Sequence, residues 1–293
     1  MKTVALVTKV SLRVSKRHLS LLGTMMCSTF FLVFSVMLSA CSCSMSSEKL
    51  EFSRAEKAKL KNDFRSAIIH YKNIVDKSVR SPLAIHSAKE LANINHYQVK
   101  DIKVAITYYK HVVLYSSDEK ERFEAQKNIA DLNFSQTQDY GQAVVEYSRL
   151  LELPRSPLED FSFRMALARS HFYLSNFYQA QVELDVLLAK NFERELLFEP
   201  LLLKANTLLS SKKYDEATVI LNNLMLEYPD RSKVETIGLI LAVTYEEQKN
   251  FSKAIETLEV IKDEYPKKGF IEGRIKTLKE RQSYLPGARG WKK

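Results

Sequence analysis

Turn-forming residues are scarce in this sequence. Glycine and proline each occur only seven times in 293 residues. An all-β fold needs frequent tight turns, and those turns depend on residues that tolerate special backbone angles. The scarcity disfavours an all-β fold and leaves helices as the main expected element.

Acidic residues are missing from the first forty positions. This stretch carries five basic side chains and no Asp or Glu, and it contains an uncharged run of 22 residues from Leu19 to Ala40. A basic segment followed by an apolar one is typical of a secretory signal peptide. The run is also long enough to be an uncleaved membrane-spanning helix. Both interpretations export the remainder of the chain.

The apolar run ends in the residues Leu38, Ser39, Ala40 and Cys41, which resemble the lipobox of bacterial lipoproteins. The resemblance implies cleavage before Cys41, a lipid on its thiol and acylation of the new amino group. Ser42, in place of Asp, resembles the sorting signal for the outer membrane. We therefore expect residues 1–40 to be a removed signal peptide and residues 41–47 a Ser-rich, lipid-anchored tether facing the periplasm. Anchoring in the inner membrane by an uncleaved helix is the alternative.

Loss of the leader changes the charge and the cysteine count. Five unmatched basic residues are removed, so the formal net charge falls from +9 to +4. This small excess lies among alternating Lys and Glu, which is typical of a solvated surface and not of a nucleic-acid-binding stripe. Cys27 leaves with the leader and Cys41 carries the lipid, so only Cys43 remains. An intramolecular disulfide and a cysteine-based metal site are therefore excluded.

A repeat fills the remainder of the chain. Apolar or aromatic residues at −3, +4 and +7 flank an alanine in each copy, which is one face of a helix. A second small residue occurs twelve positions earlier in four copies; Asn93 and Asp131 take that place in the second and third, with Ala92 and Ala130 one position off. Each copy predicts a hairpin of a first helix (helix A) and a second helix (helix B). The helix B alanines, spaced by 38, 38, 37, 37 and 37 residues, are Ala67, Ala105, Ala143, Ala180, Ala217 and Ala254.

This hairpin resembles the tetratricopeptide repeat. The resemblance runs from about Glu48 to Arg281; its period exceeds the usual ~34 residues, and the usual early Trp is absent. It implies an all-α, right-handed superhelical solenoid of about six hairpins over residues 48–283, followed by a flexible tail over 284–293. Stacked hairpins would bury one continuous core.

The sequence spacing of the histidines and paired glutamates does not match a catalytic or metal-binding motif. The histidines after the leader show no metal-ligand spacing, and His96 and His171 fall at partly buried helix A positions. Glu246 and Glu247 are adjacent on a helix, so their side chains diverge. A Gly-rich phosphate loop, HExxH and GxSxG are all absent. We expect a protein that is not an enzyme and that uses no cofactor, metal or small-molecule substrate.

Peptide or protein binding is the expected activity. The family resemblance implies that helix A positions 5, 9 and 12 line a concave groove. Aromatic side chains beside a lone arginine would suit a peptide segment, and the alternative is that these side chains pack between hairpins. The Lys and Asn clamp of chaperone-binding members is not reproduced. The predicted groove residues are Tyr97, Leu132, Met165, Arg169, Phe172, Asn206 and Val243.

Three classes of function stay open. The first is a lipid-anchored scaffold for envelope proteins, loosely similar to the tetratricopeptide lipoprotein of outer-membrane protein assembly. Pilus biogenesis and coordination of division or wall synthesis are alternatives within that class. The second is a carrier or chaperone for exported polypeptides, and the third is a glycan or peptidoglycan binder. Stable co-purification with one partner favours the scaffold, whereas weak binding to many apolar peptides favours the carrier.

Overall fold

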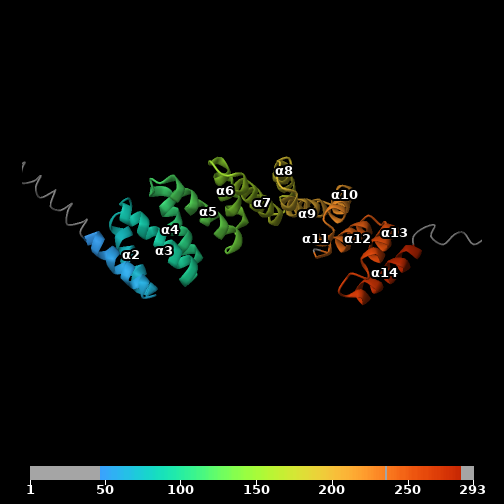
Figure 1. Cartoon of the computed structure of the whole chain (residues 1–293), viewed down its shortest axis with the longest axis horizontal. Helices are drawn as coiled ribbons and strands as arrows, with labels where there is room; N and C mark the ends of the chain where they lie inside the picture. The colour runs from blue at the N-terminus through green and yellow to red at the C-terminus, as the bar shows by residue number, and fades with distance from the viewer. Residues whose placement is uncertain (1–46, 235, 285–293) are drawn as a thin grey trace, which may run out of the picture. The chain divides into compact units, whose positions relative to one another are not determined.

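The computed structural model describes residues 47–234 and 236–284, which form helices and no strand (Figure 1). The predicted signal peptide, Cys41 and Trp291 lie outside these ranges. None of the described helices is both long and apolar enough to cross a membrane. The chain divides into two compact units, one ending at Asp101 and the other beginning at Ile102.

The first unit holds the first hairpin and helix A of the second repeat. Its first helix covers residues 47–60. It is followed by α2 (Phe64–Lys77), α3 (Pro82–Ile94) and the π-helical turn η1 (Asn95–Val99). Helix α2 packs against α3, and η1 continues α3.

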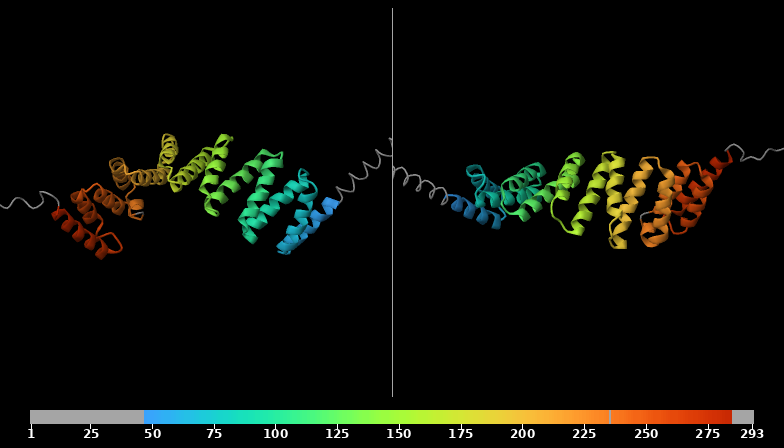
Figure 2. Two further views of the ribbon diagram at one scale, coloured as in Figure 1. Left: turned by 180° about the vertical axis from the view of Figure 1, so that it is seen from behind. Right: turned by 90° about the horizontal axis from the view of Figure 1, so that it is seen from above.

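The second unit is a run of consecutive helices that can be followed in Figures 1 and 2. Each helix packs against the next, and α10 also contacts α12 past the short helix α11. Helix A of the third to sixth repeats is α5, α7, α9 and α12, and helix B of the second to sixth repeats is α4, α6, α8, α10 and α13. The bounds are α4 (Ile102–Tyr115), α5 (Glu119–Ser135), α6 (Tyr140–Glu152), α7 (Pro157–Tyr173), α8 (Phe177–Leu188), α9 (Arg194–Ser210), α10 (Tyr214–Glu227), α11 (Pro229–Val234), α12 (Ile237–Glu247), α13 (Phe251–Ile261) and α14 (Lys268–Ser283).

The repeat alanines lie where helices touch. All six helix B alanines have no exposed surface, and the residues four positions after them, such as Tyr147 and Leu221, are also buried. The helix A residues Ala55, Ala168 and Ala205 are equally inaccessible. The predicted helical face is therefore confirmed at these positions. The small side chains allow neighbouring backbones to approach closely.

The second and third repeats correct the predicted spacing. Ala92 and Ala130 are fully buried, whereas Asp131 is exposed. The small residue of helix A thus lies thirteen positions before the helix B alanine in these repeats, and not twelve. In the second repeat the π-helical turn η1 absorbs the extra residue. In the third, four residues connect α5 to α6, whereas three connect α7 to α8.

A tyrosine contact supports the corrected register. Tyr147 donates a hydrogen bond from its hydroxyl to Asp131 at 2.7 Å. In the first repeat the equivalent helix B residue, Tyr71, donates to Glu56, which directly follows Ala55. Asp131 and Glu56 therefore occupy the same place, one residue after the buried alanine of helix A.

Each turn between helix A and helix B contains a residue in the left-handed region. Its φ lies between 53° and 62°, and it is always five positions before the helix B alanine. This conformation costs an L-residue about 1 to 2 kcal/mol, and glycine avoids that cost. None of the seven glycines occupies these positions, which are Asn62, Lys100, Gln138, Ser175, Lys212 and Lys249.

Glycine at these turns should stabilise the protein. We expect Lys212→Gly and Lys249→Gly each to raise the free energy of unfolding by about 0.5 to 1 kcal/mol, measured by urea denaturation. Lys213→Gly is the matched control, because Lys213 has a φ of −88° and gains nothing from glycine. A similar effect at Lys212 and Lys213 would contradict the assigned turn geometry.

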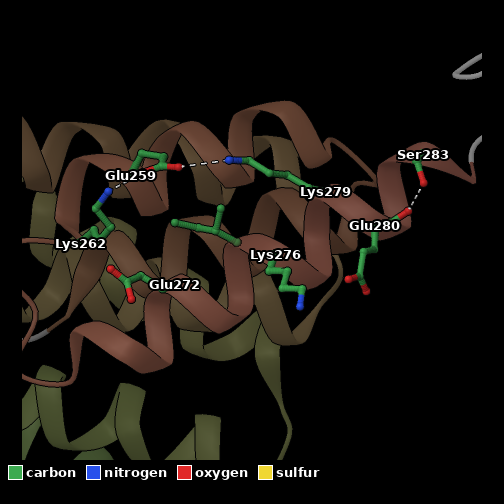
Figure 3. Close-up of a pocket in the computed structure, with 8 residues that line it drawn as sticks. Glu259, Lys262, Glu272, Lys276, Lys279, Glu280 and Ser283 are labelled. Carbon is green, nitrogen blue, oxygen red and sulfur yellow. Dashed lines mark hydrogen bonds and ion pairs between the residues drawn. The ribbon is translucent and has the colours of Figure 1, made fainter.

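Helix α14 completes the described stack as a further helix A. Its buried residues Ile271, Ile275 and Leu278 join a core cluster that also contains Leu258 of α13. An open hollow between α13 and α14 is lined mainly by charged side chains (Figure 3). Within it, Glu259 pairs with Lys262 at 2.9 Å and with Lys279 at 3.4 Å. In stacks of repeats, a polar outer face on the terminal unit makes the end of the stack soluble. The charged side chains of α13 and α14 provide such a surface.

Candidate functional site

The structure leaves five of the predicted groove residues accessible. Tyr97 is 59% exposed and Val243 is 37% exposed. The Arg169 side chain is 42% exposed, and Phe172 and Asn206 are half-buried. Tyr97 belongs to the first unit, and the other four belong to helices A of the second unit. We call the accessible side of α7, α9 and α12 that carries Arg169, Phe172, Asn206 and Val243 the helix A face.

The prediction that Leu132 and Met165 line the groove is wrong. Leu132 is 2% exposed and Met165 is 6% exposed, so neither side chain is accessible to a partner. The one-residue shift in the third repeat moves Leu132 out of the predicted position and into the interior. Met165 packs in a core cluster with Leu184 and Leu187 of α8. For these two residues, packing between helices was the right alternative.

A charged cluster connects α7 and α9, two helices of the helix A face, with the short helix α11. Arg169 on α7 donates to one carboxylate oxygen of Glu199 on α9 at 3.3 Å. Arg231 on α11 donates to the other oxygen at 2.8 Å. The three side chains are between 38% and 44% exposed. Two guanidinium groups on one carboxylate give a net charge of +1, and their ten N–H donors outnumber its acceptor sites. We call these three residues the Arg169 cluster.

The position of Arg231 depends on the helix that follows Pro229. Helix α10 ends at Glu227, and Pro229 is the first residue of α11. The Arg231 guanidinium lies 4.0 Å from the ring centroid of Phe198 on α9, which is a cation–π distance. Tyr228 donates a hydrogen bond from its hydroxyl to the backbone oxygen of Arg194 at 2.8 Å. These contacts fix α11 against α9 and direct Arg231 toward Glu199.

Half-buried apolar side chains lie on the same two helices as Arg169 and Glu199. Phe172 is one helical turn from Arg169, and its ring centroid is 5.9 Å from that of Phe177. On α9, Leu202 and Leu209 pack partly against the core cluster around Leu221. The helix A face therefore offers cationic donors and half-buried apolar groups within two neighbouring hairpins.

A pocket of about 560 Å³ lies between α12 and α14. Glu246, three residues after Val243 on α12, accepts hydrogen bonds from Arg274 at 2.7 and 3.0 Å and from Arg281 at 3.3 Å. We call this the α14 pocket. The side chains and backbone that line it include Glu246, Phe270, Gly273, Arg274, Thr277 and Arg281.

The histidine and glutamate residues considered for catalysis are half-buried, ion-paired or exposed. His96 and His171 are half-buried, and burial lowers the pKa of both imidazoles; for His171 the charge of Glu183 opposes that effect. Glu246 pairs with two arginines whereas Glu247 is exposed. The described ranges hold no group of three or more His, Cys, Asp or Glu side chains that could bind a metal ion.

Known proteins share the fold of this chain. Residues 238–268 match the family described as Tetratricopeptide repeat. No curated protein matches the chain. Among solved structures it is similar to YrrB, a TPR protein with an unusual peptide-binding site, with a TM-score of 0.50 and 16% identity over 70% of this chain and 97% of that one. The predicted all-α stack of tetratricopeptide-type hairpins is confirmed.

Two further solved structures are similar at lower TM-scores. A tetratricopeptide repeat protein from Parabacteroides merdae has a TM-score of 0.48 and 20% identity over 81% of this chain and 89% of that one. PilW, a type IV pilus biogenesis factor, has a TM-score of 0.46 and 14% identity over 74% of this chain and 92% of that one.

Proposed function

We propose that this chain is a non-catalytic scaffold that binds a polypeptide segment of an envelope protein on the helix A face of its second unit. The observation that carries the proposal is the Arg169 cluster, where two guanidinium groups converge on Glu199 at an accessible surface. Backbone carbonyls and carboxylates of a polypeptide are acceptors that suit the N–H donors left over by Glu199. Phe172 supplies an apolar contact next to them.

The fold supports a polypeptide as the ligand class. YrrB, which has a similar fold, is a TPR protein with an unusual peptide-binding site. In the present chain the combination of arginine, an aromatic ring and aliphatic side chains is typical of surfaces where a few residues provide most of the binding energy. Asn206 adds an amide that can both donate and accept hydrogen bonds with a peptide backbone.

Site-specific photocrosslinking in cells tests this function. A photoreactive amino acid at Asn206 or Val243 should crosslink to one envelope polypeptide. The same group at Asn223, which is exposed on helix B of the same repeat as Asn206, should not. Crosslinks to many unrelated polypeptides would favour a carrier for exported chains. Equal crosslinking from Asn223 and Asn206 would contradict the assigned face.

The scaffold is proposed to be held at the outer membrane by lipid on Cys41, with the helices in the periplasm. Multiple acyl chains on one residue give stable anchoring where a single chain would be marginal. We expect mass spectrometry of the native protein to find Cys41 as the first residue, with acyl mass attached. Cys41→Ala should remove that mass and leave the protein unprocessed. An unmodified chain that begins at Met1 would contradict the anchor and favour an uncleaved helix.

A further inference from the structure

The α14 pocket contains a glycine that packing does not require. Gly273 lies in the interior of α14, where glycine destabilises a helix relative to alanine. A Cβ added at Gly273 would meet no atom within 4 Å, and the same is true of Gly269, one turn earlier on the same face. At Gly238 of α12, by contrast, an added Cβ would lie 2.6 Å from the side chain of Ile261, so glycine is required there by packing. Among residues 47–234 and 236–284, therefore, none fills the space above Gly269 and Gly273, which leaves it open to a ligand.

The charge of the pocket favours an anionic ligand. Arg274 and Arg281 both bind Glu246, whose side chain is only 11% exposed. Their side chains are 31% and 53% exposed, so the arginines and not the glutamate dominate the accessible surface. The charged residues that line the pocket are Glu246, Arg274 and Arg281, which together give a net charge of +1. Since the carboxylate of Glu246 already accepts hydrogen bonds from both arginines, an anionic ligand group fits this lining better than a cationic one.

An aromatic surface adjoins the arginines. Phe270 lines the pocket and is 50% exposed. Its ring lies nearly parallel to that of Tyr265, at an interplanar angle of 29° and a centroid distance of 6.2 Å. One face of an apolar or aromatic ligand group can cover Phe270 and remove it from water.

We propose that the α14 pocket binds an acidic peptide segment in which a carboxylate lies close to an aromatic side chain. The carboxylate binds the N–H donors of Arg274 and Arg281 beside Glu246. The aromatic ring packs on Phe270, and the peptide backbone passes over Gly273, where no side chain blocks close approach. This inference rests on the proposed function, because it names the chemistry of the polypeptide that the helix A face receives.

Three peptides and two variants of the full chain test the inference. The probe is a short fluorescein-labelled peptide of Glu, Phe and Ser; one control peptide has Gln at each Glu, and the other has Ala at each Phe. Fluorescence anisotropy should show that the wild-type chain binds the probe at least tenfold more tightly than either control. Gly273→Leu fills the pocket and should weaken probe binding at least tenfold. Its melting temperature should not fall, because leucine is a better helix former than glycine.

The variant Arg274→Gln gives a second readout, a change in peptide preference that a loss of folding would not produce. It should remove most of the preference for the Glu peptide over the Gln peptide and leave binding of the Gln peptide unchanged. Equal binding of these two peptides to the wild-type chain would overturn the inference, as would unaltered binding by Gly273→Leu. Self-association of the chain that Gly273→Leu abolishes would make the occupant a second copy and would also overturn it.

Titrating the double variant Arg169→Ala/Phe172→Ala with the same probe separates failure of the α14 inference from failure of the proposed function. If this double variant loses binding and Gly273→Leu does not, the α14 assignment fails and the helix A face stands. If the wild-type chain binds no probe, the acidic-peptide inference fails. Position-dependent crosslinking from Asn206 would still support the scaffold.

Discussion

Replacing Ala217 with tryptophan should lower the free energy of unfolding by more than about 2 kcal/mol. Ala217 has no exposed surface, and its helix α10 packs against both α9 and α12. A tryptophan side chain can be accommodated there only if these helices move apart. The separation would expose neighbouring core residues such as Leu221 and Leu224, which are fully buried. Urea denaturation followed by circular dichroism measures the loss.

Asn223→Trp provides the matched control for that substitution. Asn223 is exposed on the same helix, so tryptophan there displaces nothing and should change the free energy of unfolding by no more than about 0.5 kcal/mol. Similar losses at Ala217 and Asn223 would mean that the alanine does not set the distance between helices. The repeat assignment built on the six alanines would then be wrong.

The fold was predictable because close packing of repeated helices constrains residue size at fixed intervals. Ala143, Ala180 and Ala217 recur 37 residues apart because each meets a neighbouring helix in the same way. Single-residue insertions were harder to place. The alanine spacing alone does not distinguish an extra residue inside a helix, as in η1, from an extra residue in the connection after α5. The prediction therefore assigned Asp131 and Leu132 one position away from their structural places.

The proposed binding face was predictable only in part, because ion pairs between repeats depend on how helices stack. Arg169 was identified from its position on helix A. Its partner Glu199 belongs to the next repeat, and Arg231 belongs to a short helix that the repeat pattern does not contain. Arg274 was missed for a different reason. No helix B alanine follows α14 within the described residues, so the spacing that marks the other hairpins is absent there.

The double substitution Arg169→Ala/Phe172→Ala should weaken binding of the crosslinked partner segment by at least about 2 kcal/mol, roughly thirtyfold. The two residues lie three positions apart on α7 and present a guanidinium and an aromatic ring on one side of the helix. Removing Arg169 deletes a charged donor and leaves Glu199 with Arg231 alone. Removing Phe172 deletes the apolar contact beside it. Titration of the purified chain with the labelled segment measures the change.

Stability distinguishes a binding role from a packing role for the same pair. Phe172 contacts Phe177 within its own hairpin, so a small decrease in melting temperature is expected from its loss, whereas Arg169→Ala alone should leave melting nearly unchanged. Tyr178→Ala is the control, because Tyr178 is an aromatic residue that is 74% exposed on α8 and away from the helix A face. If the double variant melts early but binds normally when folded, both side chains serve the core. The Arg169 cluster would then be a contact between hairpins and not a binding surface.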